Sequence, residues 1–264
     1  MQHVLITGAA GNIGRTLRAG LRGRYPLLRL VDVAPQRAAG AGEEVLTVDL
    51  NDRLATEAAM EGVDAVVHLA AIPHEASFDD ILTGNITTTY SVFGAARRTG
   101  VRRVVFASTN HVIGFYPRGH TVDQDDPVRP DTFYGASKAF GEALGRLYAD
   151  KYGLEVVCLR IGSFAERPTT WRQLSIWLSP RDCVQLVRCC LDADAVGFKI
   201  VYGVSANTRS WWKDDAAARL GYQPQDNAEE FALKIEEPPP EAASRLADRL
   251  QGGSFVEQDP TNRG

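Results

Sequence analysis

The sequence predicts an α/β fold in which helices cover both faces of a doubly wound parallel sheet of about seven strands. Short apolar runs rich in β-branched residues alternate with longer helical patterns along the first 160 residues. These runs are apolar at most positions, which is typical of parallel strands that are buried on both faces. With 264 residues, 44% of them hydrophobic, the chain can also bury a substantial core.

The predicted elements follow one another in strict alternation. Strands are expected at residues 3–7, 27–31, 44–48, 65–69, 103–107, 155–159 and 199–201. Helices are expected where apolar positions recur with helical spacing, at residues 13–21, 53–60, 85–99 and 136–152. We therefore assign residues 1–160 to one domain that contains most of the sheet.

Residues 161–264 have a less regular pattern and are expected to form a small lobe over the carboxyl ends of the strands. Residues 168–178 resemble a loop, 180–191 an amphipathic helix, and 205–221 a Trp-containing loop followed by a short helix. Pro238, Pro239 and Pro240 then interrupt the chain, and residues 241–264 are expected to form a surface helix and tail. We expect this lobe to bind the substrate and to pack with the first domain as one globular unit.

Charge and apolar pattern exclude several classes of partner. With 29 Lys and Arg residues against 33 Asp and Glu residues, the net charge is −4, which offers no basic surface for nucleic acid. Met1–Thr7 do not resemble a signal peptide, and no run of about 18 apolar residues follows, so we expect a cytoplasmic protein that does not enter the membrane. The four cysteines lack the spacing of a zinc site and are expected to be buried thiols, and no metal site is predicted.

A glycine-rich turn lies where the first predicted strand meets the first predicted helix. Residues 7–14 read Thr-Gly-Ala-Ala-Gly-Asn-Ile-Gly. Glycines at the first two positions allow a tight turn and the close approach of a pyrophosphate to backbone N–H groups, and the third lets the helix lie against the sheet. This strand–turn–helix context predicts a Rossmann-type dinucleotide site, formed by Gly8, Gly11, Asn12, Ile13 and Gly14.

An acidic residue follows at the end of the second predicted strand. Asp32 lies near the distance from the turn at which a carboxylate binds the adenosine ribose hydroxyls, which favours NAD. Arg15 and Arg37 are close enough in sequence to keep NADP as the minor alternative, and Asp32 could instead cap a loop. Further residues at the same sheet edge leave space for adenine and its ribose, namely Asp49, Leu50, Leu69, Ala70, Ala71 and Ile72.

A phenol and an ammonium are paired near the start of the helix expected at 136–152. Tyr134 and Lys138 are one helical turn apart, so both side chains lie on one face. The ammonium and a cationic nicotinamide ring are expected to favour the phenolate, which would then take a proton from a substrate hydroxyl. Thr109, Asn110 and His111 follow the fifth predicted strand and should open into the same crevice.

These motifs together resemble the extended short-chain dehydrogenase/reductases, and among them the uronate dehydrogenases, which are NAD-dependent oxidisers of glucuronate and galacturonate. The broader resemblance is carried by the glycine turn, Asp32, Asp49-Leu50, residues 68–71 and the Tyr134/Lys138 pair. The narrower one extends over nearly the whole chain, through residues 106–116, 160–163, 175–179, 205–207, 211–212 and 251–256. These latter segments are more specific, because many enzymes with different substrates share the glycine turn and the Tyr/Lys pair.

The resemblance implies a role for each matching residue. Tyr134 would be the general base, Lys138 would support it and bind the nicotinamide ribose, and Ile161 would contact the cofactor. Thr109 stands where the family usually has Ser and would keep the catalytic hydroxyl. The implied substrate contacts are Pro73, Thr109, Asn110, His111, Tyr134, Ser163 and Arg172.

Two of these substrate positions matter for specificity. Arg172 has the planar guanidinium that can hold a sugar carboxylate through two hydrogen bonds. Pro73 stands where the family has a Ser that touches the sugar, and the lost hydroxyl leaves the affinity and the choice between uronate epimers open.

Alternatives remain for single residues. His111 could be a packed histidine, and Arg172 could be a solvated loop cation, with Arg167 as the next candidate for the carboxylate. The tryptophans at 177, 211 and 212 are expected to pack within the lobe rather than to form a platform for sugar stacking.

Two other functions also remain open. A sugar-nucleotide epimerase or dehydratase could use the same scaffold, although roughly 100 C-terminal residues are few for a nucleotide-sugar lobe. A non-catalytic NAD-binding interaction protein is the third alternative, but it has no need to keep Tyr134, Lys138 and Thr109 together. We expect a homo-oligomer, and the sequence does not settle its size.

Overall fold

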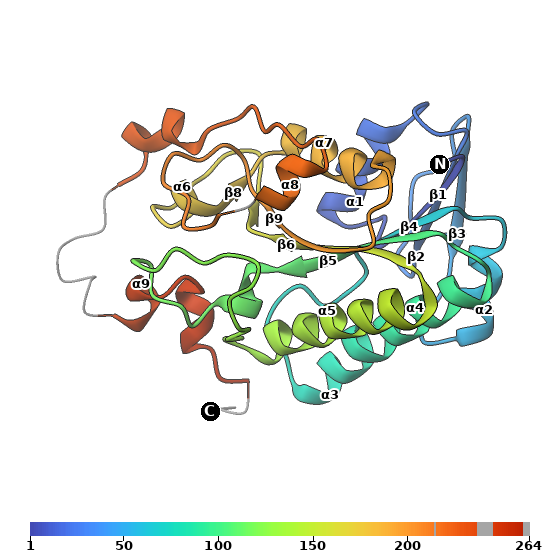
Figure 1. Cartoon of the computed structure of the whole chain (residues 1–264), viewed down its shortest axis with the longest axis horizontal. Helices are drawn as coiled ribbons and strands as arrows, with labels where there is room; N and C mark the ends of the chain where they lie inside the picture. Colours follow the sequence, from blue (N-terminus) through green and yellow to red (C-terminus); the bar gives the residue numbers. More distant parts are fainter. Residues whose placement is uncertain (214, 237–244, 261–264) are drawn as a thin grey trace.

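A parallel sheet runs through the centre of the molecule, with helices on both of its faces (Figure 1). The structure is a computed structural model that describes residues 1–213, 215–236 and 245–260. Within these ranges, seven strands form one sheet in the order β3-β2-β1-β4-β5-β6-β9, and every neighbouring pair is parallel. The predicted doubly wound α/β fold is therefore confirmed.

Each predicted strand occurs close to its expected position. The strands are β1 His3–Thr7, β2 Leu27–Asp32, β3 Glu43–Thr47, β4 Ala65–His68, β5 Arg103–Thr109, β6 Glu155–Ile161 and β9 Phe198–Gly203. β5 and β6 continue two residues beyond the predicted ends, because Thr109 and Ile161 still pair with each other in register. This extension brings both residues to the carboxyl edge of the sheet.

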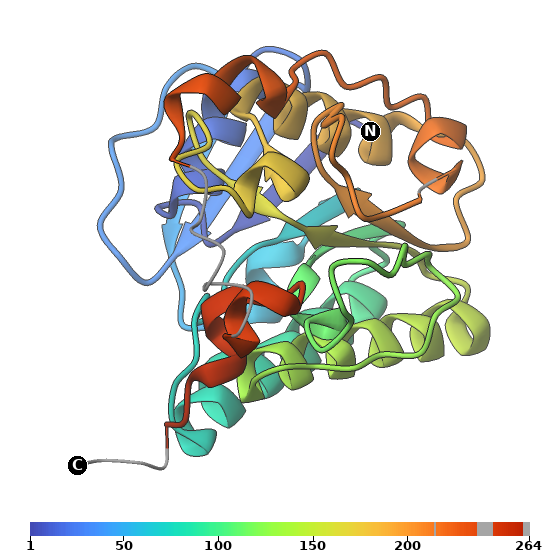
Figure 2. The same cartoon turned by 90° about the vertical axis from the view of Figure 1, so that its left-hand side faces the viewer.

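Two apolar cores separate the sheet from its helices. On one face lie α1 Asn12–Leu21, α7 Pro180–Asp192 and α8 Asp215–Arg219, and on the other α2 Arg53–Met60, α4 Thr88–Arg98 and α5 Phe133–Tyr152 (Figures 1 and 2). β9 and α7 both come from residues 161–264, so this part of the chain completes the sheet and one of its helical layers. No helix of the described ranges is long and apolar enough to cross a membrane.

The helix expected at 85–99 is interrupted at its start. The chain forms α3 Phe78–Ile81 and the π-helical turn η1 Leu82–Thr87 before α4 begins at Thr88. Within this π turn, Asn85 bonds the backbone N and O of Ile72 and the hydroxyl of Ser137. A buried amide with three partners outside its own helix holds the irregular turn against the rest of the fold.

The loop expected at 168–178 also contains regular structure. α6 Gln173–Ile176 leads directly into β8 Trp177–Leu178, which pairs with β7 Ser163–Phe164 in a separate parallel pair. Strands of two residues are too short to leave a pattern of alternation in the sequence. The prediction of a plain loop was therefore wrong for residues 173–178.

The middle of the predicted surface helix and tail, residues 251–253, is buried, whereas most residues on either side of it are exposed or half-buried. The C-terminal segment contains α9 Leu246–Arg249 and the 3₁₀ segment η5 Gly253–Glu257. Further 3₁₀ segments occur earlier in the chain, η2 Asn110–Ile113 after β5 and η3 Ala228–Lys234. The two C-terminal elements lie beside the loop that follows η2 (Figures 1 and 2), because backbone N–H groups of residues 251 and 252 donate to carbonyls of residues 116 and 114. The predicted surface helix occurs as α9, but the prediction of a surface tail was wrong for residues 251–253, which are buried. Pro238, Pro239 and Pro240, with residues 241–244 and 261–264, lie outside the described residues.

The side chain of Gln251 explains this inward packing. It is fully buried, and its amide donates to the carbonyls of Pro117 and His120 and accepts from the indole of Trp212. A buried amide with all three hydrogen bonds made anchors the C-terminal segment in one position. The segment is thereby held against the part of the chain that leaves β5.

Candidate active site

A cavity of about 940 Å³ lies at the carboxyl ends of the strands, near the point between β1 and β4 where the strand order reverses. Its wall includes every residue that the sequence analysis proposed for cofactor or substrate. These residues are Gly8, Gly11, Asn12, Ile13, Gly14, Asp32, Asp49, Leu50, Leu69, Ala70, Ala71, Ile72, Pro73, Thr109, Asn110, His111, Tyr134, Lys138, Ile161, Ser163 and Arg172. Sequence reasoning missed several other lining residues, among them Gly84, Thr88, Phe164 and Phe255.

The glycine turn packs so closely against its surroundings that no side chain fits at Gly8 or Gly14. Gly8 has a φ of +68°, and a Cβ there would lie 2.7 Å from the backbone nitrogen of Ala70. A Cβ on Gly14 would overlap the carbonyl oxygen of Gly8. No described side chain caps α1 at Gly11, so the N–H groups of its first turn remain available to an anion. The turn therefore fits the pyrophosphate of a dinucleotide.

Asp32 both caps a loop and lines the cavity. Its two carboxylate oxygens accept hydrogen bonds from the backbone nitrogens of Ala10 and Ala34, each at 2.9 Å. Arg15 donates instead to the Ala10 carbonyl and to Asn12, and neither Arg15 nor Arg37 lines the cavity. The charge that faces the cavity at the end of β2 is thus negative.

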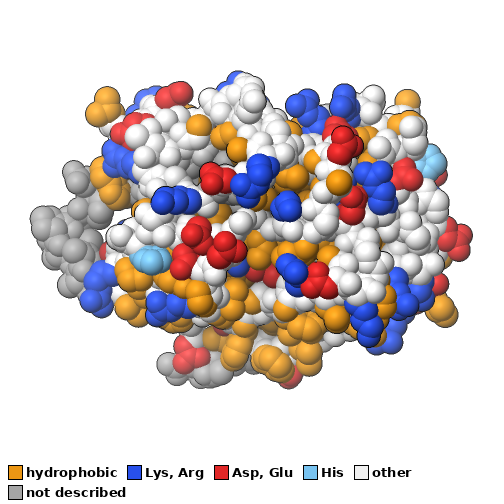
Figure 3. Space-filling model, in the orientation of Figure 1, with side chains coloured by type: hydrophobic (Ala, Val, Ile, Leu, Met, Phe, Trp, Pro, Cys, Tyr) orange, Lys and Arg blue, Asp and Glu red, His pale blue; other side chains and the backbone are white. Residues whose placement is uncertain are grey.

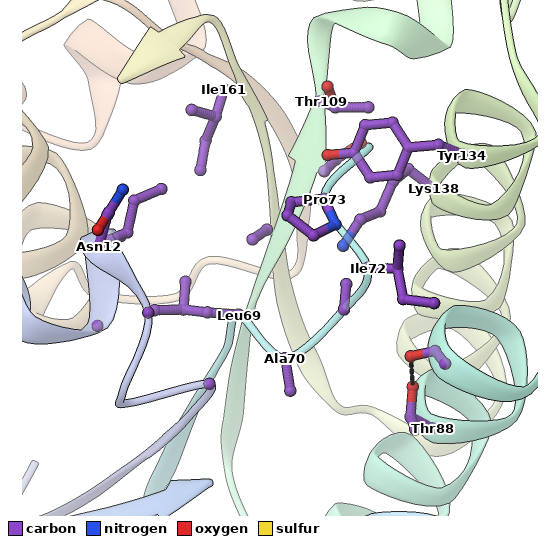
Figure 4. A pocket seen from close by; sticks show the side chains of 18 of the residues that line it. Asn12, Leu69, Ala70, Ile72, Pro73, Thr88, Thr109, Tyr134, Lys138 and Ile161 are labelled. Atoms are coloured by element: carbon purple, nitrogen blue, oxygen red, sulfur yellow. Dashed lines mark hydrogen bonds between the residues drawn. The ribbon is translucent and has the colours of Figure 1, made fainter. Parts of the chain in front are cut away.

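Tyr134 and Lys138 project from α5 into the end of the cavity that also holds Thr109 and Pro73 (Figure 4). Burial raises the pKa of the Tyr134 phenol to about 12, and a hydrogen bond with Thr109 opposes this rise. The phenolate expected from the sequence depends on a cationic nicotinamide ring as well as on Lys138; among the protein's own groups, desolvation of the phenol outweighs the interactions around it.

Lys138 is buried beside the phenol. Burial lowers the pKa of its ammonium to about 7, and Nζ lies 5.0 Å from the ring centre of Phe106 and 5.9 Å from that of Tyr134. No hydrogen bond joins Lys138 to another residue of the described ranges, and its side chain lines the cavity. The ammonium is therefore placed to serve a ligand and the adjacent phenol.

Two acceptors hold the first turn of α5, which carries Tyr134. The Thr132 hydroxyl accepts from the backbone nitrogen of Gly135 at 2.9 Å. The Glu75 carboxylate accepts from the nitrogens of Phe133 at 3.1 Å and Tyr134 at 2.9 Å. Glu75 lies two residues after Pro73, so it ties the loop after β4 to the helix of the phenol. A single loop glutamate carries no sequence signal for this contact, and sequence reasoning missed it.

His111 is held from two sides and still faces the cavity. Its Nδ1 bonds the Asp131 carboxylate at 2.8 Å, and its ring stacks on Phe255 with 3.9 Å between ring centres. Sequence reasoning missed both partners. Phe255 lies in the 251–256 segment that carried the narrower family resemblance, and this was the signal that could have found it. The interpretation of His111 as only a packed histidine does not account for its place on the cavity wall.

Arg172 is a half-buried cation at the same end of the cavity. Its Nε donates to the carbonyl of Gln251 at 2.7 Å. With the Asn110 amide turned so that its nitrogen donates to the Ile161 carbonyl, its oxygen accepts from Arg172 Nη2 at 2.8 Å. Burial lowers the pKa of the guanidinium to about 10, which still leaves it charged at neutral pH. The alternative of a solvated loop cation is therefore wrong for Arg172, whereas Arg167 is exposed and does not line the cavity.

The tryptophans pack as expected rather than face the cavity. Trp177 donates from its indole to the Ala165 carbonyl and meets Phe231 edge to face. Trp212 stacks on Tyr202 with 4.8 Å between ring centres. Trp177, Trp211 and Trp212 are not part of the cavity wall.

Comparison with known proteins agrees with this site. Residues 4–165 match the NAD dependent epimerase/dehydratase family. A uronate dehydrogenase from Pseudomonas putida is 45% identical over 261 residues, which cover 98% of this chain and 97% of that protein. A crystal structure of a glucuronic acid dehydrogenase from Chromohalobacter salexigens has a TM-score of 0.95 at 39% identity, covering 99% of each chain. A mutant uronate dehydrogenase from Agrobacterium tumefaciens, complexed with NAD, has a TM-score of 0.94 at 42% identity, covering 98% of each chain.

The matches to whole proteins cover 98–99% of this chain. The chain therefore belongs to the NAD dependent epimerase/dehydratase family and, within it, to the uronate dehydrogenases.

Proposed function

We propose that this protein oxidises a hexuronate such as glucuronate or galacturonate at C1, with NAD⁺ as the hydride acceptor. The observation that carries this proposal is one cavity that joins a dinucleotide turn, the buried pair of Tyr134 and Lys138, and the half-buried cation of Arg172. A hexuronate has the two groups that such a site would recognise, an oxidisable anomeric hydroxyl and a carboxylate.

The cofactor would lie along the wall formed by the ends of β1, β2 and β4. Backbone N–H groups of the Gly8–Gly14 turn would hold the pyrophosphate, and Asp32 would accept from the adenosine ribose hydroxyls. Lys138 lies toward the opposite end, where the nicotinamide and its ribose would be placed, and Ile161 lies between Asn12 and Thr109 in the view of Figure 4. When bound, NAD⁺ supplies the acceptor for the hydride that leaves C1.

Tyr134 would act as the general base. Its phenolate takes the proton of the anomeric hydroxyl, and the loss of this proton together with the C1 hydride turns C1 into the carbonyl of an aldarolactone. The Thr109 hydroxyl stabilises the phenolate by donating a hydrogen bond, since its interaction lowers the pKa of Tyr134. A charged Lys138 close to the ring favours the phenolate further.

Arg172 would bind the uronate carboxylate, with Asn110, His111 and Ser163 as further polar contacts. The Nε of Arg172 is already bonded to Gln251, so the outer nitrogens of the guanidinium are the ones that face the ligand. Ser163 accepts from Gln173 at 2.8 Å, which leaves its hydroxyl proton free to donate. Pro73 supplies only apolar contact, so we expect the choice between uronate epimers to depend on the other polar groups.

The direct test is turnover of purified protein with NAD⁺. We expect NADH absorbance with glucuronate or galacturonate, and an aldarolactone by NMR spectroscopy of the product. Absence of NADH with both uronates would contradict the proposal. Turnover of a UDP-sugar by protein that retains NAD would instead indicate an epimerase or dehydratase, and NAD binding without turnover of any sugar acid would indicate a non-catalytic protein.

We also propose that the protein works in the cytoplasm as a homo-oligomer. Hydrophobic side chains gather along the lower edge of the face in Figure 3, over α3, α4 and α5. Several of them are substantially exposed, including Phe78, Tyr90, Phe140 and Leu147. Such a helical face suits a second copy of the same chain. Light scattering should give a mass above that of one chain, and cell fractionation should recover the protein with cytoplasmic enzymes.

A further inference from the structure

Asp131 is a buried carboxylate that lies behind the substrate end of the cavity. Its side chain is 0% exposed, and it is not part of the cavity wall. One oxygen accepts from Nδ1 of His111 at 2.8 Å, and the other accepts from the Thr132 hydroxyl at 2.9 Å. Asp131 therefore has no direct access to a ligand and can act on one only through His111.

Bare backbone from two distant segments makes room for this carboxylate. A Cβ on Gly114, in the loop after β5, would overlap the Asp131 carboxylate. A Cβ on Gly252, in the C-terminal segment, would overlap the same group. The two glycines are joined by a hydrogen bond from the Gly252 nitrogen to the Gly114 carbonyl at 2.9 Å. The Asp131 carboxylate is thus packed against the backbone of Gly114 and Gly252, where no side chain would fit.

Burial lowers the pKa of the His111 ring, which leaves it neutral near neutral pH. The cation of Arg172 lowers this pKa further, and Asp131 and Glu75 oppose these effects. A neutral imidazole has one N–H, and a carboxylate accepts a hydrogen bond only from the nitrogen that carries it. The bond to Asp131 therefore places the proton on Nδ1 and leaves a lone pair on Nε2.

We propose that Asp131 is a positioning residue, which holds His111 in the Nδ1–H tautomer so that Nε2 accepts a hydrogen bond from a hydroxyl of the bound sugar. The ring lines the cavity, and Nε2 makes no hydrogen bond to any residue in the described part of the chain. The stacked Phe255 limits rotation of the ring, so the proton on Nδ1 also sets the direction of the Nε2 lone pair.

With this tautomer, the substrate end of the cavity would recognise a carboxylate at one position and a hydroxyl at another. Arg172 offers only donors and suits the carboxylate, whereas Nε2 of His111 offers only an acceptor and suits a hydroxyl. The identity of the sugar rests on the proposed function, but the tautomer of His111 does not. The two can therefore be tested separately.

The first experiment measures the tautomer by ¹⁵N NMR of the histidine rings in wild type and in Asp131→Ala, with His111 assigned through His111→Asn. We expect a protonated Nδ1 and a bare Nε2 in wild type. In Asp131→Ala, which has no carboxylate to hold the Nδ1 proton, we expect a shift toward the Nε2–H tautomer. Asp125→Ala, which removes an exposed carboxylate, is the matched control and should leave His111 unchanged.

The second experiment measures steady-state kinetics with galacturonate. Loss of one neutral hydrogen bond should raise KM by about 3- to 13-fold in Asp131→Ala and leave the affinity for NAD⁺ unchanged. If that variant does not fold, Asp131→Asn serves instead. Its single carbonyl oxygen can accept from only one of Thr132 and His111, so we expect a mixture of tautomers and a smaller rise in KM.

A wild-type ring with the proton on Nε2 would overturn the proposal, even if the protein oxidises uronates. Folded variants that keep both the Nδ1–H tautomer and the wild-type KM would overturn it as well. If wild type has the expected tautomer but no uronate is oxidised, the proposed function fails and the positioning role of Asp131 stands.

Discussion

Arg172 offers the sharpest test of substrate recognition, because it is the half-buried cation of the cavity wall that is proposed to meet the sugar carboxylate. In Arg172→Ala the site loses the charge and the donors that face the ligand, together with the bond from Nε to the Gln251 carbonyl. A hydrogen bond between charged groups contributes about 1.5–3 kcal/mol. We therefore expect kcat/KM for galacturonate to fall by roughly 10- to 200-fold.

The chemistry of the guanidinium predicts how far a second cation can replace it. Arg172→Lys keeps the positive charge but loses the planar fork, so we expect only partial recovery of kcat/KM. The matched control is Arg167→Ala, in the same segment but exposed and away from the cavity wall, and it should leave kcat/KM within about 2-fold of wild type.

The assay compares uronates with neutral aldoses at saturating NAD⁺, following NADH formation. Galactose has no carboxylate, so any oxidation of it should be almost unaffected by Arg172→Ala. Equal losses for galacturonate and galactose would refute the reasoning, because they would mean that Arg172 supports the C-terminal segment rather than the ligand. NAD⁺ affinity and Tm of each variant would identify a loss of folding.

Three further variants test the cofactor edge, the support of α5 and the buried ammonium. Asp32→Ser should reduce the preference for NAD⁺ over NADP⁺ by about 10-fold or more, measured as the ratio of kcat/KM values, because the carboxylate no longer repels a 2′-phosphate; an unchanged ratio would place the determinant elsewhere. Glu75→Ala should lower kcat by about 3- to 10-fold with little change in NAD⁺ affinity, because the first turn of α5 loses two hydrogen bonds, and Glu75→Gln should recover part of the loss. Burial lowers the pKa of Lys138 from 10.5 to about 7. Between pH 7 and pH 10.5 the unfolded chain therefore binds one proton at this lysine that the folded chain does not bind. The stability of wild type should therefore rise with pH across this range. Lys138→Met should abolish turnover, raise Tm near neutral pH by roughly 4 °C or more, and remove this part of the pH dependence; a lower Tm would show that the ammonium stabilises the fold.

Local sequence patterns predicted the sheet and the parts of the site that depend on it. Buried parallel strands require apolar runs, and the turn between β1 and α1 requires glycine where a Cβ would strike Ala70. Tyr134 and Lys138 could be paired from sequence because one helical turn relates them. Parallel strands end at one edge, which also placed Thr109 beside them.

Contacts between distant segments could not be predicted in the same way. Asp131 reaches His111 only because Gly114 and Gly252 leave room, and these three positions share no local pattern. Residues 241–264 were expected to form a surface helix and tail after the proline break, yet the amide of Gln251 finds three partners inside the fold. The raised pKa of Tyr134 could not be read from the sequence either, because burial is a property of the folded chain and here outweighs the effects of neighbouring groups.

The central claim is that Tyr134 takes the proton as hydride leaves C1 of a hexuronate. The most direct measurement uses galacturonate that carries deuterium at C1, with NMR detection of deuterium in the reduced cofactor and of the lactone. Wild type should transfer the deuterium to NADH and form the aldarolactone, whereas Tyr134→Phe should bind NAD⁺ normally and transfer almost none. Deuterium that stays on the sugar with wild type, or transfer by Tyr134→Phe at more than about a tenth of the wild-type rate, would contradict the account.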